Sequence, residues 1–96
     1  MKTEDIVTYH REEILTTARK HGAYNVRVFG SVARGEARPD SDIDFLVNLE
    51  AGRSLMDLAR LLRELQLLLG RNVDVVTEAG LRPRIRPQVL KDARAL

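Results

Sequence analysis

The sequence predicts a small α/β domain, in which about four helices flank a mixed sheet of three or more strands. Two observations favour this class. Apolar residues recur at helical spacing in two long segments, and short apolar runs that contain valine lie between the helical segments. A chain of 96 residues is long enough for one hydrophobic core, so we expect a single domain over residues 1–96.

The first part of the chain predicts a helix, a strand and a short helix. Residues 3–20 carry an apolar stripe at helical spacing, and Gly22 is a plausible stop. Residues 26–29 predict a short strand that runs into Gly30 and Ser31. One or two helical turns should follow before a turn that contains proline.

The middle of the chain predicts a buried strand and an amphipathic helix. Residues 43–49 are apolar on both faces beyond their acidic start, which is typical of a central strand that is covered on both sides. Residues 55–69 form a leucine-rich stripe that Ser54 can cap and that Gly70 should end.

The last part predicts a third strand over residues 72–77 and a final helix after the region of Pro83 and Pro87. The element order is therefore α-β-α-β-α-β-α. Because a helix joins the second and third strands, we expect these two strands to be neighbours in the sheet.

The composition indicates a globular protein in the aqueous phase. Hydrophobic residues make up 44% of the chain and charged residues 31%, whereas disordered chains lack so much apolar material. The absence of cysteine fits a reducing cytosol and excludes disulfides and thiolate metal sites. No signal peptide is visible, and charges interrupt the leucine-rich stretch. We expect a cytoplasmic protein without membrane association.

Three aspartates indicate a metal site. Asp42 and Asp44 share one face of the second strand, roughly 6.5 Å apart, and repel each other unless a cation lies between them. Asp74 is the only charge within the third strand, where a carboxylate is unfavourable without a partner. If the two strands are neighbours, the three carboxylates form an oxygen-rich site that suits Mg²⁺.

Each aspartate also has an ordinary structural explanation. The pair on the second strand could reflect turn chemistry after Pro39. Asp74 could form a buried ion pair with Arg27 or Arg71. The coincidence of all three favours the metal site.

A Gly-Ser dipeptide at the end of the first strand indicates a phosphate contact. Gly30 allows close approach to the backbone, and Ser31 places a hydroxyl and free N–H groups at the start of a short helix. Such a dipeptide alone is a weak signal. Its position ten residues before the Asp-x-Asp strand strengthens it.

The net charge of +2 is concentrated near the C-terminus. Residues 81–96 contain five basic side chains and one acidic one; the basic residues are Arg82, Arg84, Arg86, Lys91 and Arg94. This segment could dock an acidic partner or a nucleoside triphosphate, or it could be an ordinary solvated helix. Direct nucleic-acid binding is disfavoured because no aromatic residues are interleaved for base stacking.

The stretch GSVARGEARPDSDIDFLV, followed by VDVV, resembles the signature of the nucleotidyltransferase superfamily related to DNA polymerase beta, in its minimal form, the MNT domain. The resemblance covers nearly the whole chain. It implies a nucleotidyltransferase fold and, as often in this group, an antitoxin encoded beside a HEPN-domain ribonuclease toxin. It further implies transfer of AMP from ATP to a tyrosine of that toxin.

The resemblance also implies a role for each motif residue. Gly30 and Ser31 would hold the triphosphate of ATP, Asp42 and Asp44 would bind two Mg²⁺ ions, and Asp74 would be the third catalytic carboxylate.

Two further residues are secondary candidates for nucleotide binding. Arg34 could neutralise the β- and γ-phosphates, although a surface ion pair with Glu36 or Asp40 explains it equally well. Ser41 could contact phosphate, although capping of the turn before the strand is the simpler explanation.

Two other functions stay open. The chain could be an antitoxin that masks its toxin by binding alone, which the intact set of aspartates disfavours. It could instead be a nucleotidyltransferase for RNA or a small molecule, which the short chain disfavours because it offers no acceptor pocket. Homo-oligomers and hetero-oligomers with the toxin are both compatible with the sequence.

Overall fold

The structure, a computed structural model that describes residues 2–96, contains one mixed four-stranded sheet in the order β3-β2-β1-β4. Strands β2 and β3 are parallel, whereas β1 is antiparallel to both β2 and β4. The strands are β1 (Ala23–Phe29), β2 (Ile43–Leu49), β3 (Val73–Thr77) and β4 (Arg94–Ala95).

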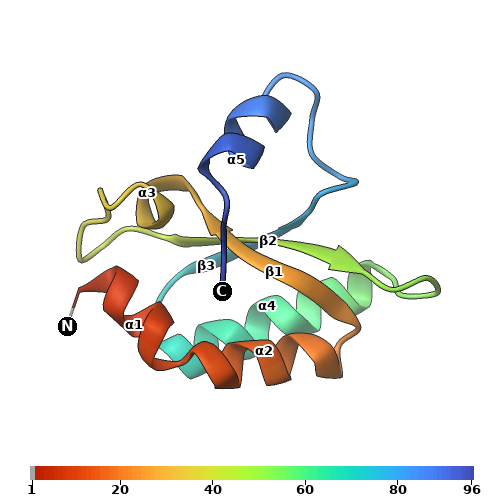
Figure 1. Ribbon diagram of the computed structural model, residues 1–96. Helices are drawn as coiled ribbons and strands as arrows, with labels where there is room; N and C mark the ends of the chain where they lie inside the picture. Colours follow the sequence, from red (N-terminus) through yellow and green to blue (C-terminus); the bar gives the residue numbers. More distant parts are fainter. Residues whose placement is uncertain (1) are drawn as a thin grey trace.

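Five helices in the described residues cover the two faces of this sheet unequally. They are α1 (Thr3–Tyr9), α2 (Arg11–Lys20), α3 (Gly30–Ala33), α4 (Leu55–Leu69) and α5 (Arg86–Asp92). Helices α1, α2 and α4 lie on one face, whereas the short helices α3 and α5 lie on the other (Figure 1). The predicted α/β class with a small mixed sheet is therefore confirmed.

Helix α4 connects the parallel strands β2 and β3, as predicted. Its start is capped reciprocally: the Ser54 hydroxyl accepts from the Met56 N–H (3.2 Å), and the Ser54 N–H donates to the Asp57 carboxylate (2.9 Å). Its end is set by Gly70 at φ +64°, a left-handed conformation that favours glycine.

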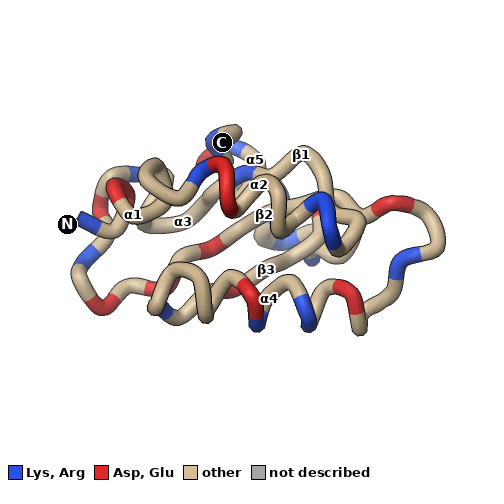
Figure 2. The backbone as a smooth tube through the Cα atoms, turned by 90° about the horizontal axis from the view of Figure 1, so that it is seen from below, with Lys and Arg blue, Asp and Glu red and all other residues tan. Residues whose placement is uncertain are grey.

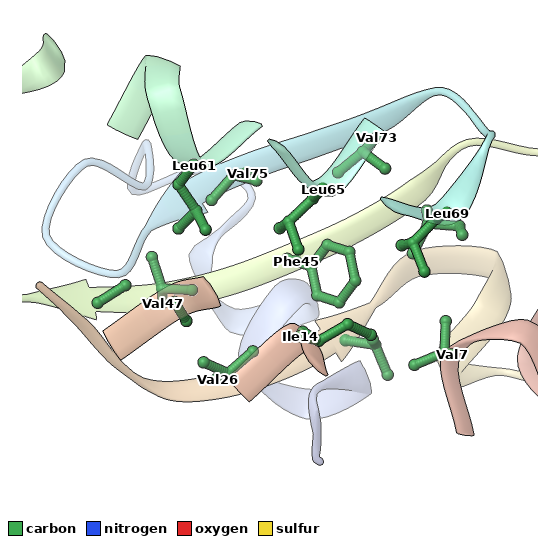
Figure 3. Packing of buried hydrophobic residues seen from close by; sticks show 14 of the residues in the cluster. Val7, Ile14, Val26, Phe45, Val47, Leu61, Leu65, Leu69, Val73 and Val75 are labelled. Carbon is green, nitrogen blue, oxygen red and sulfur yellow. The ribbon is translucent and has the colours of Figure 1, made fainter. Parts of the chain in front are cut away.

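The core lies between the sheet and helices α2 and α4. Phe45 of β2 is fully buried and lies between Ile14 of α2 and Leu65 of α4 (Figure 3). Leu46, on the opposite face of β2, is fully buried as well. Strand β2 is thus the central, two-sided strand that its sequence predicts.

The predicted helix over residues 3–20 is divided at His10. The backbone of this residue departs from helical values (φ −97°, ψ 16°). Its N–H nevertheless donates to the Ile6 carbonyl (3.1 Å), and its carbonyl accepts from the Ile14 N–H (2.9 Å). The apolar pattern therefore continues across the bend, which explains why the sequence predicts one helix.

The first strand begins three residues earlier than the sequence predicts, at Ala23. Its pairing with β2 is irregular between Tyr24 and Arg27, where Asn25 adopts φ +52°. This irregularity interrupts the alternating pattern by which a strand is predicted.

The C-terminal segment differs from the prediction in two respects. Pro87 lies in the first turn of α5 rather than before it, a position where the missing N–H of proline is not needed. The two-residue strand β4 is not predicted, because so short a strand has no periodicity to detect. Within residues 2–96, no helix has the length and apolar character to cross a membrane.

Candidate active site

The predicted meeting of acidic residues on β2 and β3 is present in the sheet. Asp44 and Asp74 are register partners on these parallel strands, and the acidic positions of the two strands lie near each other in Figure 2. Asp42 directly precedes β2 and shares the alternation of Asp44. Both side chains therefore belong to the face opposite Phe45, where α3 and α5 lie.

The electrostatic effect of this crowding appears at Asp44. Burial, the largest cause, and the negative charges of Asp74 and Asp42 together raise the pKa of Asp44 to about 6, whereas the cation of Arg34 opposes the shift. Asp42, Asp74 and Arg34 thus each lie close enough to act on the Asp44 carboxylate.

Gly30 lies directly against the carboxylate of Asp44. It has φ +72°, and a Cβ atom at this position would come within 2.5 Å of Asp44 Oδ2. The glycine is therefore required for space as well as for backbone conformation. Ser31 follows at the first turn of α3, half-buried, and its carbonyl accepts from the Glu36 N–H (2.9 Å).

Asp74 is exposed, so the desolvation that its apolar neighbours in the sequence suggested does not arise. The reason is that β3 is an edge strand, and the helices on that face, α3 and α5, pack mainly against β1 and β2. The ion-pair explanations for Asp74 are wrong: Arg27 pairs with Glu78 (3.0 Å), and Arg71 binds oxygens of the loop before β2.

The three carboxylates line an open surface rather than a closed cage. Among residues 2–96 no three Asp, Glu, His or Cys side chains are grouped tightly enough to hold a metal ion by themselves. Mg²⁺ in nucleotide sites is commonly bound by one or two carboxylates together with substrate phosphates, so an open, oxygen-rich surface is compatible with such an ion.

Arg34 forms two ion pairs. Its Nε contacts Glu36 (3.2 Å), one of the two partners expected from the sequence, and its Nη1 contacts Asp92 of α5 (2.8 Å). Hydrogen bonds to these carboxylates, that to Asp92 first, raise the pKa of Arg34. The two residues of the Arg34–Asp92 pair are 58 positions apart in the sequence, so no local sequence pattern predicts this ion pair.

Ser41 caps its turn, in agreement with the simpler explanation of this residue. Its hydroxyl accepts from the Arg38 N–H (2.7 Å). Its carbonyl accepts from Arg71 Nη2 (3.1 Å), which also donates to the hydroxyl of Thr3 (3.0 Å). Arg71 thus ties the loop that carries Asp42 to the start of β3, a role that the sequence does not indicate.

A cavity of about 490 Å³ lies between this loop, the end of α4 and the two residues that precede β3. It is lined by Asp40, Ser41, Gln66, Gly70, Arg71 and Asn72. None of the three site aspartates lines it.

Sequence comparisons relate the chain to one family. The nucleotidyltransferase domain family matches residues 11–96. The protein adenylyltransferase MntA of Thermococcus cleftensis is 39% identical over 89 residues, which cover 93% of this chain and 87% of that protein. A Methanocaldococcus jannaschii protein, provisionally named a protein adenylyltransferase, is 41% identical over 83 residues, or 86% of this chain and 89% of its own length.

Structure comparisons agree with this result. A solved structure provisionally described as a minimal nucleotidyltransferase has a TM-score of 0.88 at 54% identity and covers 100% of this chain and 97% of that one. A chain from a toxin–antitoxin complex with AMP-PNP has a TM-score of 0.76, covering 88% of this chain and 69% of its own. Its identity is 22%, so that likeness concerns the fold.

Proposed function

The chain belongs to the nucleotidyltransferase domain family, and from that premise we propose that it is a cytoplasmic antitoxin that transfers AMP from ATP to a tyrosine of a HEPN ribonuclease toxin. The main observation behind this proposal is that Asp42 and Asp74 lie close enough to Asp44 to raise its pKa, and that Asp44 lies against Gly30. The adenylyltransferase names of two relatives support the reaction. A structural neighbour from a toxin–antitoxin complex supports the partner.

We assign the two Mg²⁺ ions of this proposal to Asp42, Asp44 and Asp74. The donor set fits, because carboxylate oxygens are the ligands that Mg²⁺ prefers. The raised pKa of Asp44 also fits, because a cation would relieve the repulsion from the other two carboxylates. When bound, Mg²⁺ neutralises charge on the phosphates and on the departing pyrophosphate.

The chain's own residues bind and orient the nucleotide in this proposal. Gly30 lets the Asp44 carboxylate lie against the start of α3, and Ser31 offers its hydroxyl to a phosphate at the first turn of that helix. Arg34 supplies positive charge beside Asp44, where the β- and γ-phosphates would lie. Ser41 already caps its turn, so we place it in support of Asp42 rather than in contact with phosphate.

The transfer joins the tyrosine oxygen to the α-phosphorus and breaks the bond from that phosphorus to pyrophosphate. A free tyrosine hydroxyl has a pKa near 10, so it must lose its proton as it attacks. Asp74 is exposed on the edge strand, where an incoming protein can reach it. We assign it to accept this proton.

Intact-mass spectrometry tests the proposal. The protein encoded by the neighbouring gene is incubated with this chain, ATP and Mg²⁺, and its mass should rise by one or more AMP units located on tyrosine. Asp44→Asn should abolish the change. A partner that is inhibited without any change in mass would instead identify a masking antitoxin. AMP found on RNA or on a small molecule would identify a different acceptor.

A further inference from the structure

Helix α5 is held to the rest of the domain by little apolar contact. Of its residues only Val89 is buried. Ile85, which precedes the helix, is 47% exposed, and Leu90 within it is 38% exposed. A helix that belongs wholly to a domain core normally buries a continuous apolar stripe. The segment that contains α5, on the face of the sheet opposite α2 and α4, therefore presents Ile85 and Leu90 to solvent (Figure 1).

Basic residues without an ion-pair partner among residues 2–96 lie close to these apolar residues in the sequence. Four exposed basic residues belong to this segment, and in the described part of the chain none of them forms an ion pair: Arg82, Arg84, Lys91 and Arg94. We call these four, with Ile85 and Leu90, the α5 surface.

The acidic residues closest in sequence are used internally. Glu78 pairs with Arg27 (3.0 Å) and with Arg86 (3.4 Å), whose Nη1 also donates to the Glu78 carbonyl (2.8 Å). Asp92 pairs with Arg34 and accepts from Gln88 (3.0 Å). Arg86 therefore anchors the loop, whereas the α5 surface keeps its positive charge.

The α5 surface adjoins the candidate active site. Helices α3 and α5 cover the same face of the sheet, and this is the face that Asp44 shares (Figure 1). The Arg34–Asp92 ion pair joins α5 to the residue that ends α3, and α3 begins at Gly30, against the Asp44 carboxylate. A protein bound on α5 would lie beside the carboxylates, where an acceptor side chain is needed.

We propose that the α5 surface is the docking site for the acceptor protein, and that this protein presents acidic side chains around an apolar contact. Charge complementarity and the exposed Ile85 and Leu90 select this partner. RNA is the disfavoured occupant: the aromatic side chains of the chain, two Phe and two Tyr, all lie before residue 46, so the α5 surface offers no stacking platform. The identity of the partner rests on the function proposed above.

Two pairs of matched variants test this docking site. The test variants are Arg82→Glu with Arg84→Glu, and separately Leu90→Ser. The controls lie on α4, on the other face of the sheet, where basic positions are visible in Figure 2: Arg60→Glu with Arg63→Glu, and separately Leu67→Ser, at a residue that is 75% exposed. The controls change the same charge and the same side-chain type.

Affinity for the purified neighbour-encoded protein is measured by calorimetry at two salt concentrations, and MgATP affinity is measured separately. Both test variants should bind that protein at least about tenfold more weakly, with MgATP affinity unchanged, and the wild-type affinity should fall as salt rises. The α4 controls should match the wild type. An equal loss of affinity for that protein in the α4 controls, or no loss of affinity in the test variants, would overturn the proposal.

Two further outcomes separate this inference from the proposed function and from RNA binding. A wild-type protein that docks through α5 but transfers no AMP would overturn the proposed function and leave the docking site standing. A labelled single-stranded RNA that binds tightly and is lost with Arg82→Glu and Arg84→Glu, and that displaces the partner protein, would assign the surface to RNA and overturn the docking proposal.

Discussion

Gly30 and Asp44 lie so close together that a methyl group at position 30 would contact the Asp44 carboxylate, with Cβ 2.5 Å from Oδ2. The two residues belong to different elements, since Gly30 begins α3 and Asp44 lies in β2. The start of α3 is therefore packed against one of the proposed metal ligands, Asp44. A change at the glycine must move the carboxylate.

The first prediction uses this contact. Gly30→Ala should lower stability by about 1–2 kcal/mol because of its left-handed backbone, and it should also abolish AMP transfer by displacing Asp44. Gly35→Ala is the matched control, because Gly35 has the same φ of +72° and a methyl group there would meet no atom within 4 Å. It should lose similar stability and keep its activity. Equal activities in the two variants would contradict a functional role for the Gly30 contact.

The second prediction concerns pH. The pKa of Asp44 is about 6 in the folded protein and near 3.8 when unfolded, so the folded state binds the extra proton between these values. The protonated Asp44 carboxyl contributes to the stability of the folded state at low pH, and this contribution is lost as the pH rises through 6. Asp44→Asn should therefore stabilise the metal-free protein by about 1–2 kcal/mol at pH 7, after allowance for solvent screening, and by little near pH 4.

Asp57, whose pKa is shifted in the opposite direction, serves as the control for Asp44→Asn. The backbone N–H of Ser54 lowers the pKa of Asp57, so this carboxylate stabilises the fold above its unfolded pKa and loses that effect as pH falls. Asp57→Asn should therefore be destabilising at pH 7. Urea unfolding of both variants from pH 4 to pH 7 checks the two signs. An Asp44→Asn effect that does not grow with pH would refute the predicted charge crowding.

Local patterns explain why α4 and the acidic cluster could be predicted. The two ends of α4 are capped by residues within one or two turns of the helix, namely Ser54, Asp57 and Gly70. Residues that are close in the sequence therefore determine the caps. The sequence places Asp44 and Asp74 together because a helical crossover makes the strands that it joins neighbours, and the observed register confirms this.

Long-range contacts explain most of what the sequence does not indicate. The Arg34–Asp92 pair and the Arg71–Thr3 hydrogen bond join residues 58 and 68 positions apart, where no periodicity applies. The exposure of Asp74 depends on β3 being an edge strand, and the strand order fixes this rather than the composition of the strand. The roles of Ser31 and of the metal ligands stay predictions.

The third prediction addresses metal and nucleotide together. MgATP should raise the melting temperature, because binding to the folded state alone stabilises it. Asp42→Asn and Asp44→Asn should each remove this shift, since each deletes a proposed ligand. Asp5→Asn is a control of the same charge change at an exposed residue of α1, outside the proposed site. A shift that survives in both aspartate variants would place the nucleotide elsewhere.

The last prediction concerns Arg71, which positions Asp42 through the loop before β2. Its Nη2 donates to the Ser41 carbonyl and to the hydroxyl of Thr3, and the Thr3 side chain is buried. Arg71→Ala should lower stability by about 1–3 kcal/mol through the lost hydrogen bonds, and it should free the loop that presents Asp42.

The Mg²⁺ concentration for half-maximal AMP transfer separates positioning from stability alone. It should rise several-fold in Arg71→Ala, because a mobile Asp42 binds the ion more weakly, while transfer at saturating Mg²⁺ is largely restored. Arg71→Lys should recover part of the affinity, because an ammonium can still donate to two of the loop oxygens. Arg63→Ala, at an exposed residue on α4, should leave the Mg²⁺ dependence unchanged. If Arg71→Ala lowers stability without moving the Mg²⁺ midpoint, then Arg71 supports the fold and has no part in placing Asp42.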